Sequence, residues 1–118
     1  MATVFVRDLR FSTIVGCWDW ERQMPQEVSI DLEMDWDISA AAASDELQDA
    51  LNYKEVSHRV IAFVQDGAFE LVETAADRTA AMIVEEFSVP RVKLTFSKPR
   101  AVTGSAAVGI CVEKTAGE

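Results

Sequence analysis

Val28-Ser-Ile-Asp-Leu-Glu-Met-Asp-Trp36 alternates without interruption between apolar and polar side chains. A period of two places the two sets of side chains on opposite faces of a β-strand. We therefore predict a strand over Val28–Trp36 with one face covered by other elements and the other face in water. The apolar face of this strand sets which side of the sheet the rest of the chain must cover.

Three further segments show the alternation of a strand. The first runs over about Thr3–Val15, and its apolar phase changes across Arg7-Asp8, which predicts a β-bulge or bend. A turn-like connection then opens at Gly16. The third strand is Arg91–Lys98, which ends because the next residue is a proline without a backbone N–H donor. The last strand alternates over residues 106–113.

Two segments between the second and third strands have helical periodicity. One begins at Asn52, an N-cap residue with Glu55 three positions later, and ends at Gly67. The other covers about Leu71–Phe87 and carries apolar residues at helical spacing. The alanine-rich segment Ala40–Ala43 is compatible with one helical turn.

The order strand–strand–helix–helix–strand–strand (ββααββ) favours an α+β fold, in which a four-stranded antiparallel sheet has both helices on one face. The chain has 118 residues, which suits a single domain over residues 1–118. Few prolines or clustered lysines protect the sheet edges, which are open to pairing with other strands. We therefore expect a homo-oligomer in which the sheets of several subunits close into a barrel-shaped ring with a polar lumen.

Composition excludes several classes of function. The net charge of −9 argues against nucleic acid or an anionic membrane surface as partner. No run of about 18 apolar residues is present, so no membrane span is predicted. The N-terminus lacks the pattern of a signal peptide, and we expect a cytoplasmic protein. Cys17, Cys111 and His58 make a poor metal site, so we expect no metal and read both cysteines as reduced thiols that serve as packing residues.

Lys98 interrupts the pattern of its strand, because it continues the covered row after Val92, Leu94 and Phe96. An ammonium at that position needs either hydrogen-bond partners inside the protein or an exit to solvent along its long stem. The strand pattern leaves both interpretations open.

Three other polar residues lie at the ends of predicted elements, and each has an ordinary structural interpretation. Glu21 follows the first strand and could be a surface acid in a turn. Tyr53 lies in the first turn of the first helix, where it could pack at the edge of the core. Glu73 lies in the first turn of the second helix, where an acid complements the helix dipole. Together with Lys98 they form a set suited to proton transfer on a polar organic substrate.

Four segments resemble the signature segments of bacterial dihydroneopterin aldolases: Ile14-Val15-Gly16 with Asp19-Trp20-Glu21, Asp49-Ala50-Leu51-Asn52-Tyr53, Phe69-Glu70-Leu71-Val72-Glu73 and Ser97-Lys98-Pro99-Arg100-Ala101-Val102. Their order and spacing agree with that family from about Val4 to Lys114. Cys17 and Trp18 in the turn before Glu21, and Ala75 in place of a larger aliphatic residue, depart from the family pattern.

The resemblance implies the tunnelling fold, whose subunits close into tetrameric rings that stack as octamers with active sites between subunits. It implies a lyase of folate biosynthesis that splits 7,8-dihydroneopterin into 6-hydroxymethyl-7,8-dihydropterin and glycolaldehyde by a retro-aldol step. It also implies that neither a cofactor, a metal ion nor a lysine Schiff base is needed, since the N5=C6 imine of the substrate accepts the electron pair.

The resemblance also assigns roles to the polar residues. Lys98, Tyr53 and Glu21 would be catalytic, with Tyr53 and Glu21 also touching the substrate, and Tyr53 would serve the site of a neighbouring subunit. Glu73 would bind the amino edge of the pterin, with the backbone of Val72 alongside. Two alternatives remain: the related dihydroneopterin triphosphate 2'-epimerase, whose substrate calls for basic residues near the pocket mouth, and a catalytically silent pterin-binding scaffold.

Overall fold

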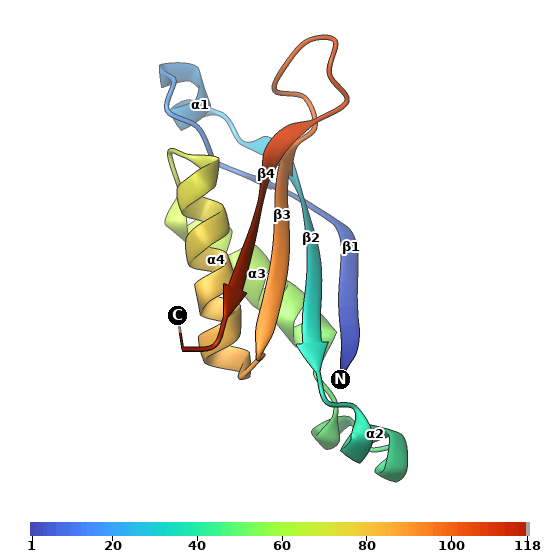
Figure 1. Ribbon diagram of the computed structural model, residues 1–118. Helices are drawn as coiled ribbons and strands as arrows, with labels where there is room; N and C mark the ends of the chain where they lie inside the picture. Colours follow the sequence, from blue (N-terminus) through green and yellow to red (C-terminus); the bar gives the residue numbers. More distant parts are fainter. Residues whose placement is uncertain (118) are drawn as a thin grey trace.

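The computed structural model describes residues 1–117 and contains one antiparallel sheet (Figure 1). Its strands lie in the order β1-β2-β3-β4. Their bounds are β1 Ala2–Thr13, β2 Gln26–Trp36, β3 Arg91–Lys98 and β4 Val108–Thr115. All four strands were predicted, and each boundary lies within a few residues of its expected place. The outer strands β1 and β4 form the two edges of the sheet.

Two long helices, α3 over Tyr53–Gly67 and α4 over Val72–Phe87, cover one face of the sheet (Figure 1). Helix α4 packs against β3 and β4, whereas α3 packs against β1. The predicted α+β class and ββααββ order are confirmed. Among residues 1–117, none of the helices is both long and apolar enough to cross a membrane.

Three short helical segments complete the chain: α1 Asp19–Gln23, α2 Ser39–Ser44 and the 3-10 turn η1 Leu47–Asp49. The segment α2 corresponds to the predicted alanine-rich turn. The helix α1 was not predicted, because only a turn-like connection was expected after Gly16. A helix of five residues is too short to show periodicity in a sequence.

The core lies between the sheet and the two long helices. The alternating residues of β2 that define the predicted covered face, Val28, Ile30, Leu32 and Met34, are fully buried. They meet the buried stripes of the helices, which include Val56, Val60 and Val64 of α3 and Ala76, Ala80 and Ile83 of α4. The periodicity of β2 therefore identified the correct face of the sheet.

A bulge in β1 confirms the predicted change of phase. The pairing of β1 with β2 shifts register between Val6 and Leu9, and Asp8 adopts a positive φ of 55°. The Asp8 carboxylate accepts hydrogen bonds from Ser29 Oγ at 2.6 Å and from Arg10 Nε at 2.8 Å. A short polar side chain that bonds both within its strand and across to β2 makes this unusual backbone conformation tolerable.

Both ends of α3 are capped by residues next to the helix in the chain. The side chain of Asn52 accepts a hydrogen bond from the backbone N–H of Glu55 at 3.2 Å, which confirms the predicted N-cap. The helix ends at Gly67 as predicted, but the left-handed residue that stops it is Ala68, with φ 42° and ψ 50°. After this turn, the carbonyl groups of Ala68 and Phe69 accept hydrogen bonds from the side chain of Arg22.

Both cysteines are free, but the expectation that they are packing residues is wrong, because both are exposed. Cys111 pairs with Thr95 on β3, and lies on the face of the edge strand that the helices do not cover. Cys17 lies in the connection between β1 and α1. Neither residue contributes to the buried core between the sheet and the helices.

The molecule is elongated, with principal extents of 51 × 27 × 20 Å. The helix α1 and the β3–β4 loop lie at one end, whereas α2 and the beginning of α3 lie at the opposite end (Figure 1). Residues at the two ends of the long axis of the molecule are therefore far apart.

Candidate active site

A cavity of about 530 Å³ opens at the end of the molecule that carries α1. Its walls come from four places: the β1–α1 connection with α1 itself, the first residue of β2, the loop before α4 with the first turn of that helix, and the adjoining ends of β3 and β4. Four predicted site residues, Glu21, Val72, Glu73 and Lys98, line this cavity. A pocket of this size suits a small organic ligand.

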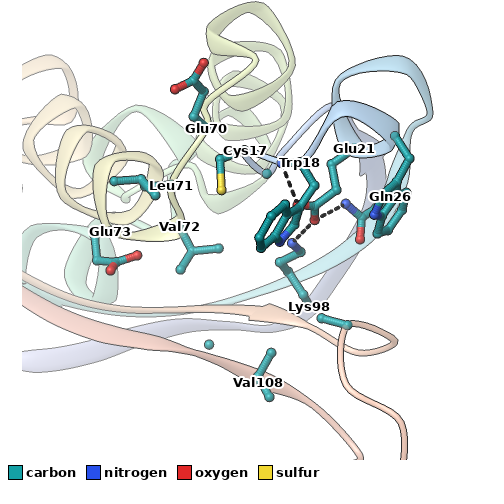
Figure 2. Close-up of a pocket in the computed structure, with 14 residues that line it drawn as sticks. Cys17, Trp18, Glu21, Gln26, Glu70, Leu71, Val72, Glu73, Lys98 and Val108 are labelled. Carbon is teal, nitrogen blue, oxygen red and sulfur yellow. Dashed lines mark hydrogen bonds and ion pairs between the residues drawn. The ribbon is translucent and has the colours of Figure 1, made fainter.

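An ion pair between Lys98 and Glu21 forms one side of the cavity (Figure 2). Lys98 Nζ lies 2.7 Å from Glu21 Oε2, and the two side chains are only 12% and 6% exposed, respectively. Lys98 therefore has a partner inside the protein and does not extend into solvent. Among residues 1–117, Nζ donates to no other side chain, which leaves further N–H donors for a ligand.

Two further groups hold the Glu21 carboxylate. Gln26 Nε2 donates to Oε2 at 2.9 Å and to the Val15 carbonyl at 2.8 Å, so it joins Glu21 to the segment that follows β1. The backbone N–H of Trp18 donates to Oε1 at 3.3 Å. Gln26 was not singled out from the sequence, because one amide side chain before a strand carries no distinguishing pattern.

The environment of Glu21 keeps its carboxyl group ionised. Burial raises its pKa, but hydrogen bonds from Lys98, Gln26 and the Trp18 N–H act in the opposite direction. Together they lower the pKa of Glu21 below that of an ordinary glutamate. The ionised carboxylate accepts a hydrogen bond from Lys98 Nζ, so the pair places a proton donor and a proton acceptor within reach of the cavity.

Gly16 allows the carboxylate of Glu21 to occupy its position. The φ angle of Gly16 is +125°, a conformation that residues with a Cβ rarely adopt. A Cβ at this residue would also overlap the carboxylate of Glu21. The glycine is thus required both by the backbone and by the side chain that forms the site.

Glu73 faces the ion pair from the other side of the cavity (Figure 2). It lies in the first turn of α4, as predicted, next to Val72. Its side chain is exposed, and within residues 1–117 no hydrogen bond or ion pair occupies its carboxylate. Both of its oxygens are available to accept bonds from a ligand, in agreement with a role in binding.

Tyr53 is not in this cavity. It is the first residue of α3, it is 60% exposed, and α3 begins at the opposite end of the molecule (Figure 1). A helix of 15 residues is about 22 Å long, and Tyr53 lies at its distant end. One chain thus brings together three of the four polar residues, and the prediction that Tyr53 serves a neighbouring subunit stays a prediction.

Large apolar side chains form the rim of the cavity. Trp18 and Trp20 are 68% and 56% exposed, and Leu71 is 50% exposed, although all three contribute to the lining. Exposed aromatic groups beside hydrogen-bonding groups suit a planar ligand with polar edges. In the sequence, Trp18 stood out only as a departure from the family pattern, and Trp20 only as part of a segment that carries the resemblance.

The described residues, 1–117, contain no group of three or more His, Cys, Asp or Glu side chains arranged to hold a metal ion.

Comparison with known proteins relates the chain to one family. The family model described as "FolB: Dihydroneopterin aldolase" matches residues 4–113. The dihydroneopterin aldolase of Escherichia coli strain K12 is 37% identical over 97% of this chain and 93% of its own length. A solved structure of the E. coli enzyme in complex with neopterin superposes with a TM-score of 0.93, at 37% identity, over 97% of this chain and 99% of that one.

The epimerase alternative also has a relative, at lower similarity. The dihydroneopterin triphosphate 2'-epimerase of Pseudomonas aeruginosa is 27% identical over 93% of this chain and 89% of its own length. The structural match to the E. coli aldolase confirms the expected tunnelling fold of the single chain.

Proposed function

This chain belongs to the dihydroneopterin aldolase family, and we propose that it cleaves 7,8-dihydroneopterin by a retro-aldol step that uses neither a metal ion nor a lysine Schiff base. The observation that carries this proposal is the buried pair of Lys98 and Glu21, 2.7 Å apart, at the side of a cavity whose other wall bears Glu73. The pair supplies proton transfer, and Glu73 supplies a place to bind the pterin ring.

In the proposed reaction the bond between C1' and C2' of the substrate side chain breaks. The 2'-hydroxyl loses its proton and becomes the carbonyl of glycolaldehyde, while the electron pair of the broken bond moves to C1' and through C6 onto N5. Lys98 serves as the proton carrier at the 2'-hydroxyl and at N5, and Glu21 orients the side chain or a relay water. Protonation at C1' with help from Tyr53, and loss of the proton on N5, complete 6-hydroxymethyl-7,8-dihydropterin.

The substrate's own chemistry supports a reaction without a Schiff base. A Schiff base provides an electron sink, but the N5=C6 imine of dihydroneopterin already provides one beside the bond that breaks.

The unoccupied carboxylate of Glu73 supports a role in binding the pterin. The 2-amino group and N3–H of a pterin are adjacent donors, and a carboxylate accepts both in a bidentate, charge-assisted pair. The backbone of Val72, beside Glu73 at the start of α4, would complete this edge of the site. The neopterin complex of the E. coli relative supports a pterin as the ligand.

Glu73→Gln should weaken the binding of neopterin by about tenfold or more while thermal unfolding changes little. The amide keeps the size of the side chain but replaces one acceptor oxygen by a donor, so the bidentate pair is lost. Calorimetric titration with neopterin measures the affinity. Glu85→Gln makes the same change on an exposed residue of α4 away from the cavity and should bind like the native chain. Equal affinity in the two variants would mean that Glu73 does not bind the ligand and only complements the dipole of α4.

We also propose that the single domain of residues 1–118 works as a ring-shaped homo-oligomer, a tetramer or an octamer. The edge strands β1 and β4 support this proposal, because strand edges without partners can pair between subunits. Tyr53, outside the cavity of its own chain, supports sites shared between subunits. The free thiols of Cys17 and Cys111 fit the reducing conditions of the cytoplasm, where we propose that the protein acts.

Product analysis tests the proposed reaction against its alternatives. Incubation with 7,8-dihydroneopterin should release glycolaldehyde and 6-hydroxymethyl-7,8-dihydropterin in equal amounts, and the triphosphate should be converted far more slowly. Preferential inversion of the triphosphate side chain would identify an epimerase. Binding of neopterin without conversion of either compound would identify a silent scaffold.

A further inference from the structure

Arg22 connects two walls of the cavity without lining it. Its side chain extends from α1 and donates three hydrogen bonds to backbone carbonyl groups. Nη1 lies 3.1 Å from the Gly16 carbonyl and 3.3 Å from the Phe69 carbonyl, and Nη2 lies 2.7 Å from the Ala68 carbonyl. No pattern in the sequence distinguishes this arginine.

The shape of the guanidinium group explains why one side chain can bind all three carbonyls. Its five N–H donors lie in one plane with fixed directions. The carbonyls come from the β1–α1 connection and from the α3–α4 loop, and the bonds to Ala68 and Phe69 span 46 and 47 residues of sequence. The backbone N–H of Gly16 also donates to the Phe69 carbonyl at 3.1 Å, so the two segments are joined directly as well.

Each segment leads straight into one wall of the site. Arg22 follows Glu21, whose carboxylate binds Lys98. Phe69 precedes the loop residues that line the cavity and begin α4, where Glu73 lies. The contacts of Arg22 therefore act on the separation between the Lys98–Glu21 pair and Glu73.

We propose that Arg22 is a positioning residue that sets this separation, so that a pterin bound by Glu73 presents its side chain to Lys98. The inference rests on the proposed function, because it assigns the ring to one wall and the reacting side chain to the other. Arg22 reaches the reaction only through the backbone that carries these groups. It fixes the distance between the two walls of the site and transfers no proton itself.

Ligands of two lengths distinguish positioning from general stability. Neopterin spans both walls, whereas pterin, the same ring without a side chain, engages the Glu73 wall alone. In Arg22→Met the affinity for neopterin should fall about tenfold, whereas the affinity for pterin should change less than about threefold. The value of kcat/KM for dihydroneopterin should fall about 100-fold, as expected when reacting groups are misplaced by about 1 Å.

Two further variants serve as controls. Arg59→Met removes a guanidinium that joins α3 to Glu86 on α4 at 2.8 Å, outside the cavity, and should leave both affinities and turnover near native values. Arg22→Lys retains a charge and several donors but not the planar arrangement, so it should recover part of the lost neopterin affinity. If Arg22 only stabilised the fold, the folded Arg22→Met and Arg59→Met variants would bind neopterin and pterin with equal affinity.

Amide hydrogen exchange tests the contacts without any ligand. In Arg22→Met, exchange should accelerate in residues 16–24 and 68–73 together, and not in β2 or β3. Unchanged exchange in both segments, or equal losses of neopterin and pterin affinity, would overturn the proposal. If the native chain fails to cleave dihydroneopterin, the proposed reaction is wrong, while exchange and the two affinities still decide the role of Arg22.

Discussion

Lys98→Met should reduce turnover of dihydroneopterin by at least about 100-fold while the protein still binds neopterin. Lys98 Nζ lies 2.7 Å from Glu21 Oε2 at the side of the cavity, where no other ammonium is present among the lining residues. Methionine retains the apolar stem and removes the proton carrier. Steady-state kinetics, with neopterin affinity measured separately, divides the effect into a large loss of kcat and a small change in binding.

Lys93→Met is the matched control for this change. Lys93 lies on the same strand, but its partners in the sheet, Glu33 and Glu113, belong to the face that the helices do not cover. Its loss should leave kcat near the native value. The Lys98 variant also leaves the buried Glu21 without its cation, so some loss of thermal stability is expected. If folded Lys98→Met turned over substrate at a near-native rate, Lys98 would be a structural partner of Glu21 and not the proton carrier.

Mixing two inactive variants should restore activity if each site is built from two chains. Tyr53→Phe should lack the hydroxyl that helps protonate C1', and Lys98→Met should lack the proton carrier. Tyr53 lies outside the cavity of its own chain, so one subunit would supply Tyr53 and its neighbour Lys98 and Glu21. After random reassembly of equal amounts, about one quarter of the sites would combine an intact Lys98 with an intact Tyr53. Activity of the mixture, compared with each variant alone, measures this fraction.

A chain with both substitutions provides the reciprocal control. Mixed equally with the native chain, it should leave about one quarter of the sites active if sites are shared, and about one half if each chain builds its own. Subunit exchange is verified by mass spectrometry of the intact oligomers. No recovery in the first mixture, together with one half in the second, would place each complete site within one subunit.

The arrangement of the fold follows from local patterns that the sequence displays directly. The alternation along Val28–Trp36 predicted its buried face, because side chains in a strand must point to opposite sides whatever surrounds them. The change of phase at Asp8 and the cap at Asn52 were predicted for a similar reason, since both are visible in the order of residues within a short segment. The helix α1 was missed because five residues are too few for a period to appear.

The candidate site was predictable in part. Chemical type and resemblance identified Glu21, Glu73 and Lys98, and the structure brings these three to one cavity. The pattern of β3 could not determine whether Lys98 leaves the core or finds a partner. That outcome depends on Glu21, which lies 77 residues earlier in the chain and is held in place by Gln26.

Periodicity therefore predicted the α+β layers and the covered face of the sheet, and resemblance predicted membership in the dihydroneopterin aldolase family, which the family match confirms. Periodicity is a pattern among residues close together in the chain, and the resemblance is a similarity along nearly its whole length. The ionised state of Glu21, the burial of Lys98 and the contacts of Arg22 across two loops required the folded molecule. Hydrogen bonds and charges depend on distances in space, and segments far apart in sequence acquire defined distances only when the sheet and helices have packed together.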